Sequence, residues 1–282
     1  MSAKSDGFVL PNGVEIPSIG FGTWQSEGEK GYEAVKMAIR AGYTHIDTAA
    51  IYETEGNVGR GVRDSGVDRK TLFVTTKLWN DVRGYEETKK AFNHSLTELG
   101  FDYVDMYLIH WPRPNKYRDV WEEMNWETWR AMEEQYDEGK VRAIGVSNFY
   151  VKHMQSLMEK ARIMPMVNQI EYHPGYVEED TAAFCKKHHI AMEGYSPLGT
   201  GRLIDHPLLV EIAKKYGKST AQVCIRWVWQ HGVLPIVKSV QEERILQNKD
   251  IFDFELAQED MLKVDSMEHI DTDGHNRDDT YF

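Results

Sequence analysis

The chain has 282 residues, with 33 lysines and arginines against 45 aspartates and glutamates, and its formal net charge is −12 at pH 7. This acidic balance argues against a protein that coats nucleic acid or binds membranes through a polybasic surface. Hydrophobic residues make up 41% of the chain, a share that excludes disorder for most of its length. A globule of this size needs no disulfide or metal to fold, and its length suits one α/β barrel as well as two smaller domains.

The sequence contains no sign of export. Its first ten residues have no basic segment followed by a long apolar run, and no stretch approaches the roughly 18 apolar residues of a membrane span. Cys185 and Cys224 belong to no C-x-x-C pair and lie in segments of helical pattern. We interpret them as small core residues, and we expect a cytoplasmic protein.

The predicted elements begin with a small hairpin over residues 8–16, closed by Asn12-Gly13. Eight further short apolar runs are typical of buried strands, and longer amphipathic segments separate them. These predicted strands are Ile19–Thr23, Tyr43–Asp47, Leu72–Lys77, Val104–His110, Ala143–Ser147, Met166–Gln169, Ala191–Tyr195 and Leu234–Lys238.

Helices are predicted between these strands. Three of them, Glu29–Ala41, Glu86–Leu99 and Trp126–Glu138, are each followed by a glycine that suits a helix end. The gap before the last strand has room for two helices. Eight strand–helix units without a linker predict a (β/α)8 TIM barrel, with one domain over residues 1–282.

A doubly wound open sheet is the alternative fold. Gly20-Phe21-Gly22-Thr23 begins like its dinucleotide-binding fingerprint but lacks the third glycine, and no P-loop motif is present. The polar, acidic tail from Asp265 to Phe282 is predicted to be either a disordered end or a flap over one face of the barrel.

Polar residues gather at the carboxyl ends of the predicted strands. Seven strands behave alike, ending in His45-Ile46-Asp47, Thr75-Thr76-Lys77, Leu108-Ile109-His110, Ser147-Asn148, Asn168-Gln169, Tyr195-Ser196 and Lys238-Ser239. In a barrel all of these ends open on one face, where active sites lie. We therefore expect the functional site at that face.

Three of these residues, together with Tyr52 in the loop after Asp47, suggest a reaction. Asp47 is the carboxylate that a buried Lys77 needs, and a lysine beside the Tyr52 phenol lowers its pKa, here to an expected value of about 7. Such a tyrosine acts as a proton donor, and His110 would bind the same oxygen. The set suits protonation of a carbonyl oxygen while a hydride reaches the carbon. Taken one at a time, these residues can also have purely structural roles. Asp47 and Lys77 can form a structural ion pair, His110 can be a core histidine, and Tyr52 can be an ordinary loop tyrosine.

The surrounding segments resemble the aldo-keto reductase family. The likeness runs from the hairpin to about Phe254, and its short loops are most similar to the compact prokaryotic and protozoal members, such as diketogluconate reductases and prostaglandin F synthase-type enzymes. The matching segments are Gly42–Tyr52, Thr75–Trp79, Leu108–Pro112, Gly145–Phe149, Asn168–Pro174 and Tyr195–Gly199.

The resemblance implies a role for each matching residue. Tyr52 would be the general acid, Asp47 and Lys77 would lower its pKa, and His110 would orient the carbonyl. Tyr195 would stack on the nicotinamide ring. The residues implied to bind the cofactor are Thr23, Trp24, Ser147, Asn148, Gln169, Tyr195, Ser196, Leu198, Lys238, Ser239, Arg244 and Asn248. The residues implied to line an apolar substrate pocket are Trp24, Trp79 and Trp111.

The segment after the last strand resembles the one that binds an adenosine 2′-phosphate. Lys238 and Arg244 near a helix start favour NADPH over NADH in an otherwise acidic protein. Val237 and Gln241 depart from the proline and the threonine or asparagine that are common there. Members of the family that reduce a steroid double bond have glutamate in place of this histidine, so that His110 indicates reduction of a carbonyl group. The resemblance thus implies an NADPH-dependent carbonyl reductase, a monomer that acts on a small carbonyl compound without nucleic-acid or membrane partners.

Two other functions are considered. A metal-dependent barrel hydrolase is one, because the chain has 11 histidines, but no H-x-H pair stands at a strand end and we expect no metal site. A cofactor-binding regulatory subunit with little turnover is the other. The absence of a partner-binding extension argues against it.

Overall fold

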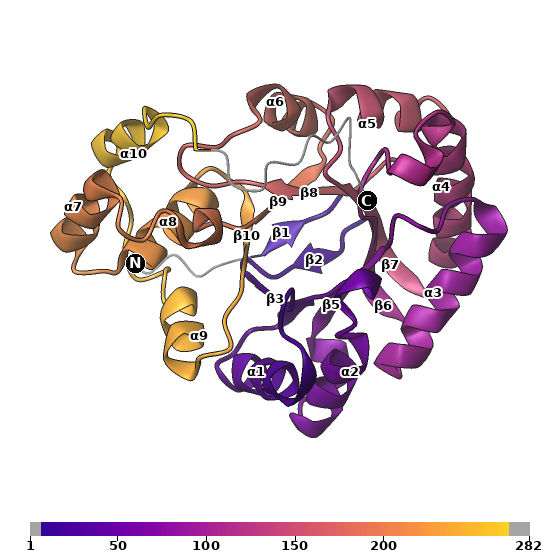
Figure 1. The fold of residues 1–282 in the computed structure, drawn as a ribbon, viewed down its shortest axis with the longest axis horizontal. Coiled ribbons are helices and arrows are strands. Elements are labelled where there is room, and N and C mark those ends of the chain that lie inside the picture. Colours follow the sequence, from indigo (N-terminus) through magenta and orange to yellow (C-terminus); the bar gives the residue numbers. More distant parts are fainter. Residues whose placement is uncertain (1–6, 271–282) are drawn as a thin grey trace.

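The computed structural model describes residues 7–270, and the helices surround the strands as a ring (Figure 1). The strands are β1 (Phe8–Val9), β2 (Glu15–Ile16), β3 (Gly20–Gly22), β4 (His45–Asp47), β5 (Phe73–Leu78), β6 (Val104–Ile109), β7 (Val141–Ser147), β8 (Val167–Glu171), β9 (Ala191–Tyr195) and β10 (Leu234–Val237). The α-helices are α1 (Gly28–Arg40), α2 (Glu55–Asp64), α3 (Tyr85–Leu99), α4 (Trp121–Asp137), α5 (Val151–Met158), α6 (Glu179–Lys187), α7 (Pro207–Tyr216), α8 (Thr220–Gln230), α9 (Glu242–Lys249) and α10 (Gln258–Asp265). Short 3-10 helices are η1 (Ala50–Tyr52), η2 (Arg69–Thr71), η3 (Asn115–Tyr117) and η4 (Gly199–Gly201).

The strands from β3 to β10 pair in parallel and in chain order, and β10 pairs back with β3 to close the barrel. The antiparallel β1–β2 hairpin stands apart from them. This arrangement confirms the predicted TIM barrel. The alternative fold, an open doubly wound sheet, is excluded because the two edges of the sheet pair with each other.

The predicted elements agree with the structure to within two residues at most boundaries. Helix α4 is the exception, since it begins at Trp121 rather than at Trp126. Glu122 and Glu123 stabilise this earlier first turn, because carboxylates interact favourably with the positive end of a helix dipole. Helix α3 ends at Gly100 with a φ of 65°, as predicted for a glycine cap.

Apolar side chains fill both faces of the sheet. The larger core lies between the strands and the helices, and both Cys185 and Cys224 belong to it, as predicted. A smaller core fills the barrel near the amino ends of the strands, where Leu10 and Ile16 of the hairpin segment pack with Phe73. The hairpin therefore closes the amino end and leaves the carboxyl end for chemistry.

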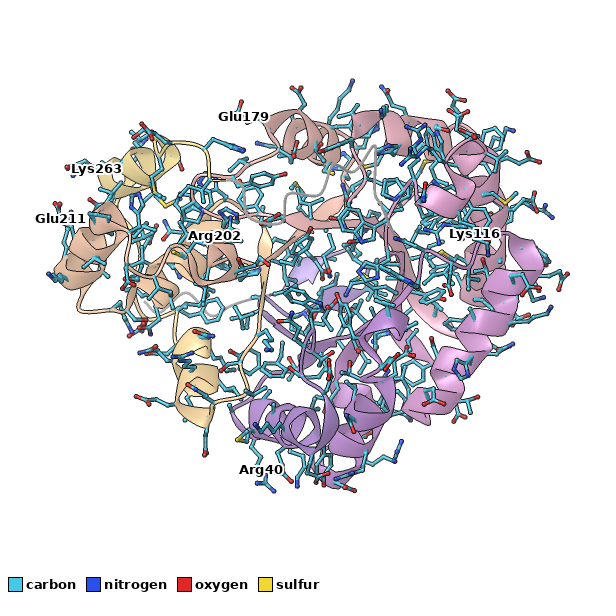
Figure 2. The ribbon with its side chains drawn as sticks, viewed as in Figure 1. Arg40, Lys116, Glu179, Arg202, Glu211 and Lys263 are labelled. Atoms are coloured by element: carbon cyan, nitrogen blue, oxygen red, sulfur yellow. The ribbon has the colours of Figure 1, made fainter. Side chains whose placement is uncertain are left out.

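Charged side chains lie on the outer, exposed surface of the molecule, as Lys116, Glu179 and Glu211 illustrate (Figure 2). None of the helices between residues 7 and 270 combines the length and apolar character that crossing a membrane requires. Most of the tail, for which a disordered end or a flap was predicted, lies outside the described residues, because the description stops at residue 270.

Candidate active site

A buried ion pair stands inside the carboxyl end of the barrel. Lys77 Nζ on β5 lies 2.6 Å from Asp47 Oδ1 on the neighbouring β4, and it also donates to the carbonyl oxygen of Thr48 at 3.0 Å. Neither side chain is more than 3% exposed. Burial acts to lower the pKa of Lys77, but the charge and hydrogen bond of Asp47, together with Tyr52 and Glu193, outweigh this effect and raise that pKa above its ordinary value. The lysine is therefore held as an ammonium.

Tyr52 lies beside this ion pair, at the end of η1. The centre of its ring is 5.2 Å from Lys77 Nζ and 5.7 Å from the centre of the His110 ring. Burial raises the pKa of Tyr52, and the Lys77 ammonium, which acts in the opposite direction, does not overcome burial. The predicted fall of this pKa was therefore wrong for this structure, because desolvation was left out. A raised pKa keeps the phenol protonated at neutral pH, which is the state that a proton donor requires.

His110 directly follows β6 and is buried between two aromatic rings. Its ring packs edge-on against those of Tyr52 and Trp79, with 5.1 Å between the centres of His110 and Trp79. Burial, together with the charges of Lys77 and Arg83, lowers the pKa of His110 well below its usual range. The imidazole is therefore neutral at pH 7 and has one N–H to donate. Asp47, Tyr52, Lys77 and His110 thus meet at one mouth of the barrel, as predicted.

The carboxyl group of Glu193 lies close to that of Asp47, and the sequence analysis did not predict it. Gln169 Nε2 on β8 donates to Asp47 Oδ2 at 2.9 Å and to Glu193 Oε2 on β9 at 2.7 Å. Burial, and then the charge of Asp47, raises the pKa of Glu193 to about 8. His45 Nδ1 is 4.0 Å from Glu193 Oε1, and burial lowers the pKa of His45 to about 4. Glu193 could have been found, because it precedes Tyr195 by two residues and so shares its face of the strand.

Ser147, Asn148 and Tyr195 form the adjoining part of the rim. Tyr195 donates its hydroxyl to Asn148 Oδ1 at 2.9 Å, Asn148 Nδ2 donates to the carbonyl oxygen of His110 at 3.1 Å, and Ser147 Oγ donates to that of Gln169 at 2.8 Å. Asn148 and Ser196 have φ values of 63° and 51°. Left-handed residues other than glycine are strained and cluster at functional sites. The structure therefore brings these predicted cofactor residues beside His110.

Thr23, which was predicted to bind the cofactor, and the three predicted pocket residues all follow strands of the barrel. Thr23 follows β3 and donates Oγ1 to the carbonyl oxygen of Asp47 at 3.0 Å, and the next residue, Trp24, is half exposed. Trp79 follows β5, and Trp111 lies after β6 and is buried. Their places in the loops of the carboxyl face are as predicted.

A cavity of about 600 Å³ lies among α7, α8 and α9, and five residues predicted to bind the cofactor line it. These are Leu198, Lys238, Ser239, Arg244 and Asn248. Lys214 adds a further cation, and no acidic residue is among the described residues that line this cavity. Lys218 lines it as well, but its ammonium pairs with Asp250 at 3.0 Å and with Asp253 at 2.6 Å. Lys214 was missed, although the basic run from Lys214 to Lys218 was a signal for it. The cavity suits a polyanionic ligand, even though the chain as a whole is acidic.

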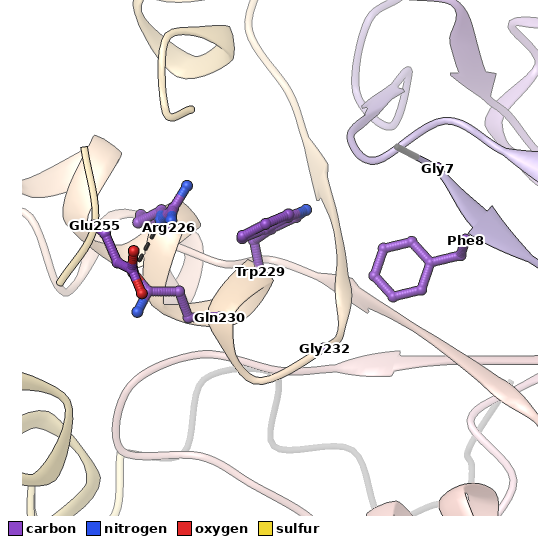
Figure 3. Close-up of a pocket in the computed structure, with 7 residues that line it drawn as sticks. All are labelled: Gly7, Phe8, Arg226, Trp229, Gln230, Gly232 and Glu255. Carbon is purple, nitrogen blue, oxygen red and sulfur yellow. Dashed lines mark hydrogen bonds between the residues drawn. The ribbon is translucent and has the colours of Figure 1, made fainter. Parts of the chain in front are cut away.

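A second hollow, of about 530 Å³, lies at the amino end of the barrel, beside the hairpin and the start of β10 (Figure 3). Its lining residues are Gly7, Phe8, Arg226, Trp229, Gln230, Gly232 and Glu255, and it includes none of the predicted site residues. Among residues 7–270, no group of three or more histidine, cysteine, aspartate and glutamate side chains is arranged to hold a metal ion.

Comparison with known proteins identifies the family of this chain. The model of the aldo/keto reductase family matches residues 18–269. The chain is 50% identical to the glyoxal reductase of Bacillus subtilis, over all of this chain and 99% of that one. It is 46% identical to the 9,11-endoperoxide prostaglandin H2 reductase of Trypanosoma cruzi, over 95% and 93% of the two chains. The crystal structure of an aldo-keto reductase of Bombyx mori in complex with NADP superposes with a TM-score of 0.85 and 37% identity, over 93% and 92% of the chains. The chain therefore belongs to the aldo/keto reductase family of oxidoreductases.

Proposed function

We propose that this protein catalyses the NADPH-dependent reduction of aldehydes and ketones to alcohols, with Tyr52 as the general acid. The observation that carries the proposal is the convergence of Tyr52, Lys77, Asp47 and His110 at one end of the barrel. A phenol, an ammonium, a carboxylate and a neutral imidazole together supply a proton and a hydrogen bond to one carbonyl oxygen.

Each of these side chains has a distinct task in the proposed reaction. Bound NADPH supplies the hydride. Tyr52 donates its proton as negative charge develops on the carbonyl oxygen, and the nearby Lys77 ammonium stabilises the phenolate that remains. Asp47 holds Lys77 in its charged form. Neutral His110 donates a hydrogen bond that orients the carbonyl group toward Tyr52.

The cofactor would be held at two places. Lys214, Lys238 and Arg244 line the cavity that suits the phosphates, including a 2′-phosphate that NADH lacks. At the other end, Tyr195 would stack on the nicotinamide ring. The remaining predicted cofactor residues at that end are Thr23, Trp24, Ser147, Asn148, Gln169 and Ser196.

Gln169 would contact the nicotinamide carboxamide in a restricted way. Its Nε2 already donates to two carboxyl groups, so that its Oε1 is the atom free to accept a hydrogen bond from the carboxamide N–H. Ser147 and Asn148 supply further polar groups beside it.

A substrate screen that follows NADPH absorbance tests this function. Glyoxal belongs in it, because a relative at 50% identity is a glyoxal reductase, along with aromatic aldehydes, α-keto compounds, quinones and sugar ketoacids. We expect turnover of at least one class, and a higher kcat/KM with NADPH than with NADH. NADPH binding without turnover on any class would instead favour a regulatory subunit.

We also infer that residues 1–282 form one domain that acts as a monomer on a small carbonyl compound. The closed barrel and the absence of a linker support this inference. Sedimentation equilibrium is expected to give a mass near 32.6 kDa. A single unfolding transition in urea is expected as well, and two separate transitions would contradict a single domain.

A further inference from the structure

The loop between β5 and α3 contains a buried arginine to which the proposed reaction assigns no role. Arg83 is only 3% exposed. Its Nη1 donates to the carbonyl oxygens of Trp79 and Val82 in its own loop, at 2.8 and 2.6 Å. Its Nη2 donates to the carbonyl oxygen of Trp111, in the loop after β6, at 2.7 Å. One planar guanidinium therefore joins two neighbouring loops, and carbonyl oxygens surround its charge.

The segment that Arg83 holds is the one that carries His110. Three successive carbonyl oxygens of this segment each accept a hydrogen bond from a different buried side chain. Asn148 binds that of His110 at 3.1 Å, Arg83 binds that of Trp111, and Asn125 binds that of Pro112 at 2.9 Å. The bonds from Asn148 and Asn125 lead to the end of β7 and to α4. The bonds from Arg83 lead to the loop of Trp79, whose ring packs against His110.

Arg83 also brings a positive charge close to His110. Tyr52 of η1, Lys77 of β5 and Arg83 are the titratable groups that face this imidazole from the elements packed against it. Burial and the charges of Lys77 and Arg83 lower the pKa of His110. Replacing Arg83 with a neutral residue would remove one of these two charges and allow the pKa to rise.

We propose that Arg83 is a positioning residue for carbonyl reduction, because it ties the Trp79 loop to the His110–Trp111 segment and so sets which carbonyl compounds fit. This inference rests on the proposed function. It differs from a plain role in folding, since it requires that loss of the guanidinium change the choice among substrates and not only the stability of the protein.

Steady-state kinetics of three variants provide the first test. Arg83→Gln and Arg83→Lys remove the planar guanidinium, and Arg226→Gln is the matched control. Arg226 is also 3% exposed and donates to a backbone carbonyl, that of Ile251, but it lies at the amino end of the barrel. The substrates are glyoxal and a two-ring aromatic aldehyde, which needs more of the pocket.

We expect Arg83→Gln to lower kcat/KM for the aromatic aldehyde at least tenfold, mainly through KM, and to lower that for glyoxal less than threefold. The Kd of NADPH, followed by protein fluorescence, is expected to stay within twofold of the wild-type value. Arg226→Gln should leave the ratio of the two kcat/KM values unchanged. Equal losses for both aldehydes, or the same change of ratio in Arg226→Gln, would overturn the proposal.

The pH profile separates the charge of Arg83 from its shape. Arg83→Lys keeps a cation near His110, so that the acid limb of kcat/KM should stay in place while the preference for the aromatic aldehyde is lost. Arg83→Gln should lose this preference and also move the acid limb to higher pH. An unchanged preference in Arg83→Lys would show that the fork of hydrogen bonds does not matter, and would refute the proposal.

Amide hydrogen exchange tests the link between the loops without any turnover. In Arg83→Gln, the amides of residues 79–84 and of His110, Trp111 and Arg113 should exchange at least tenfold faster than in the wild-type protein, while residues 145–150 keep their rates. Unchanged rates in both loops would refute the role of Arg83 even if carbonyl reduction holds. If the wild-type protein reduces no carbonyl compound, the proposed function fails, and the exchange rates still decide whether Arg83 joins the loops.

Discussion

The Asp47 carboxylate and the Lys77 ammonium are in direct contact, 2.6 Å apart, in the interior of the barrel. They belong to neighbouring strands, and the second oxygen of Asp47 accepts a hydrogen bond from Gln169 on β8. A buried charge is tolerated only where it is paired and hydrogen-bonded. Each member of this pair therefore depends on the other for stability, and in the proposed reaction for its charge as well.

Asp47→Asn is expected to destabilise the protein by about 3–5 kcal/mol, because it leaves the Lys77 ammonium buried without its counter-charge. The free energy of unfolding in urea measures this loss. The double variant Asp47→Asn/Lys77→Met should recover much of the stability, since no buried charge remains, while carbonyl reduction stays undetectable. A single variant as stable as the wild-type protein would contradict the structural importance of the pair.

Tyr52→Phe is expected to lower kcat for carbonyl reduction by about 10²–10⁴-fold, which is the usual contribution of a general acid. The Kd of NADPH should be nearly unchanged, because only a hydroxyl group at the reacting end is lost. Tyr32→Phe is a suitable control, since the Tyr32 hydroxyl binds Asp64 on the outer ring of helices. A kcat near the wild-type value in Tyr52→Phe would rule out its role as proton donor.

Arg244→Ala is expected to raise KM for NADPH about 10- to 100-fold, which corresponds to a charged hydrogen bond of about 1.5–3 kcal/mol. KM for NADH should change less than twofold, because NADH has no 2′-phosphate. Arg40→Ala, at the end of α1, removes another exposed arginine away from this cavity and serves as the control. If Arg244→Ala affects both cofactors equally, Arg244 does not contact the phosphate.

Glu193 is expected to make stability depend on pH. Its pKa is raised to about 8 in the folded protein, whereas an unfolded glutamate titrates near 4.5. Between these values the folded chain keeps a proton that the unfolded chain has released, so that stability falls as the pH rises. Below this range both states are protonated, and above it neither is, so that the dependence disappears.

The range from pH 6.5 to 8 gives the clearest measurement of this effect. Below pH 6.5, His45 changes the stability in the opposite direction to Glu193. The pKa of His45 is lowered to about 4, so that the contribution of His45 to stability grows as the pH rises toward 6.5. Between pH 6.5 and 8, Glu193→Gln should gain roughly 2 kcal/mol relative to the wild-type protein in urea unfolding. A constant difference across this range would show that Glu193 is already ionised in the folded state.

Local sequence was sufficient to predict the strands, the barrel and the face that carries the site. Side chains alternate between the two faces of a strand, so that His45 and Asp47, or Thr75 and Lys77, share one face whatever surrounds them. The carboxyl ends of parallel strands must also lie at the same end of a barrel. For these reasons Asp47, Lys77 and His110 could be assigned to one mouth from the sequence, and Tyr52 with them because its loop follows the strand that ends in Asp47.

Tertiary structure alone decided the contacts across the barrel and the electrostatics that depend on burial. Gln169 joins Asp47 to Glu193 only because the sheet closes, and this brings β4 near β8 and β9. The bond from Arg83 to Trp111 depends likewise on how two loops pack. The raised pKa of Tyr52 reflects loss of water around the phenol. Hydration of a side chain is a property of the whole fold, and no pattern of neighbouring residues in the chain specifies it.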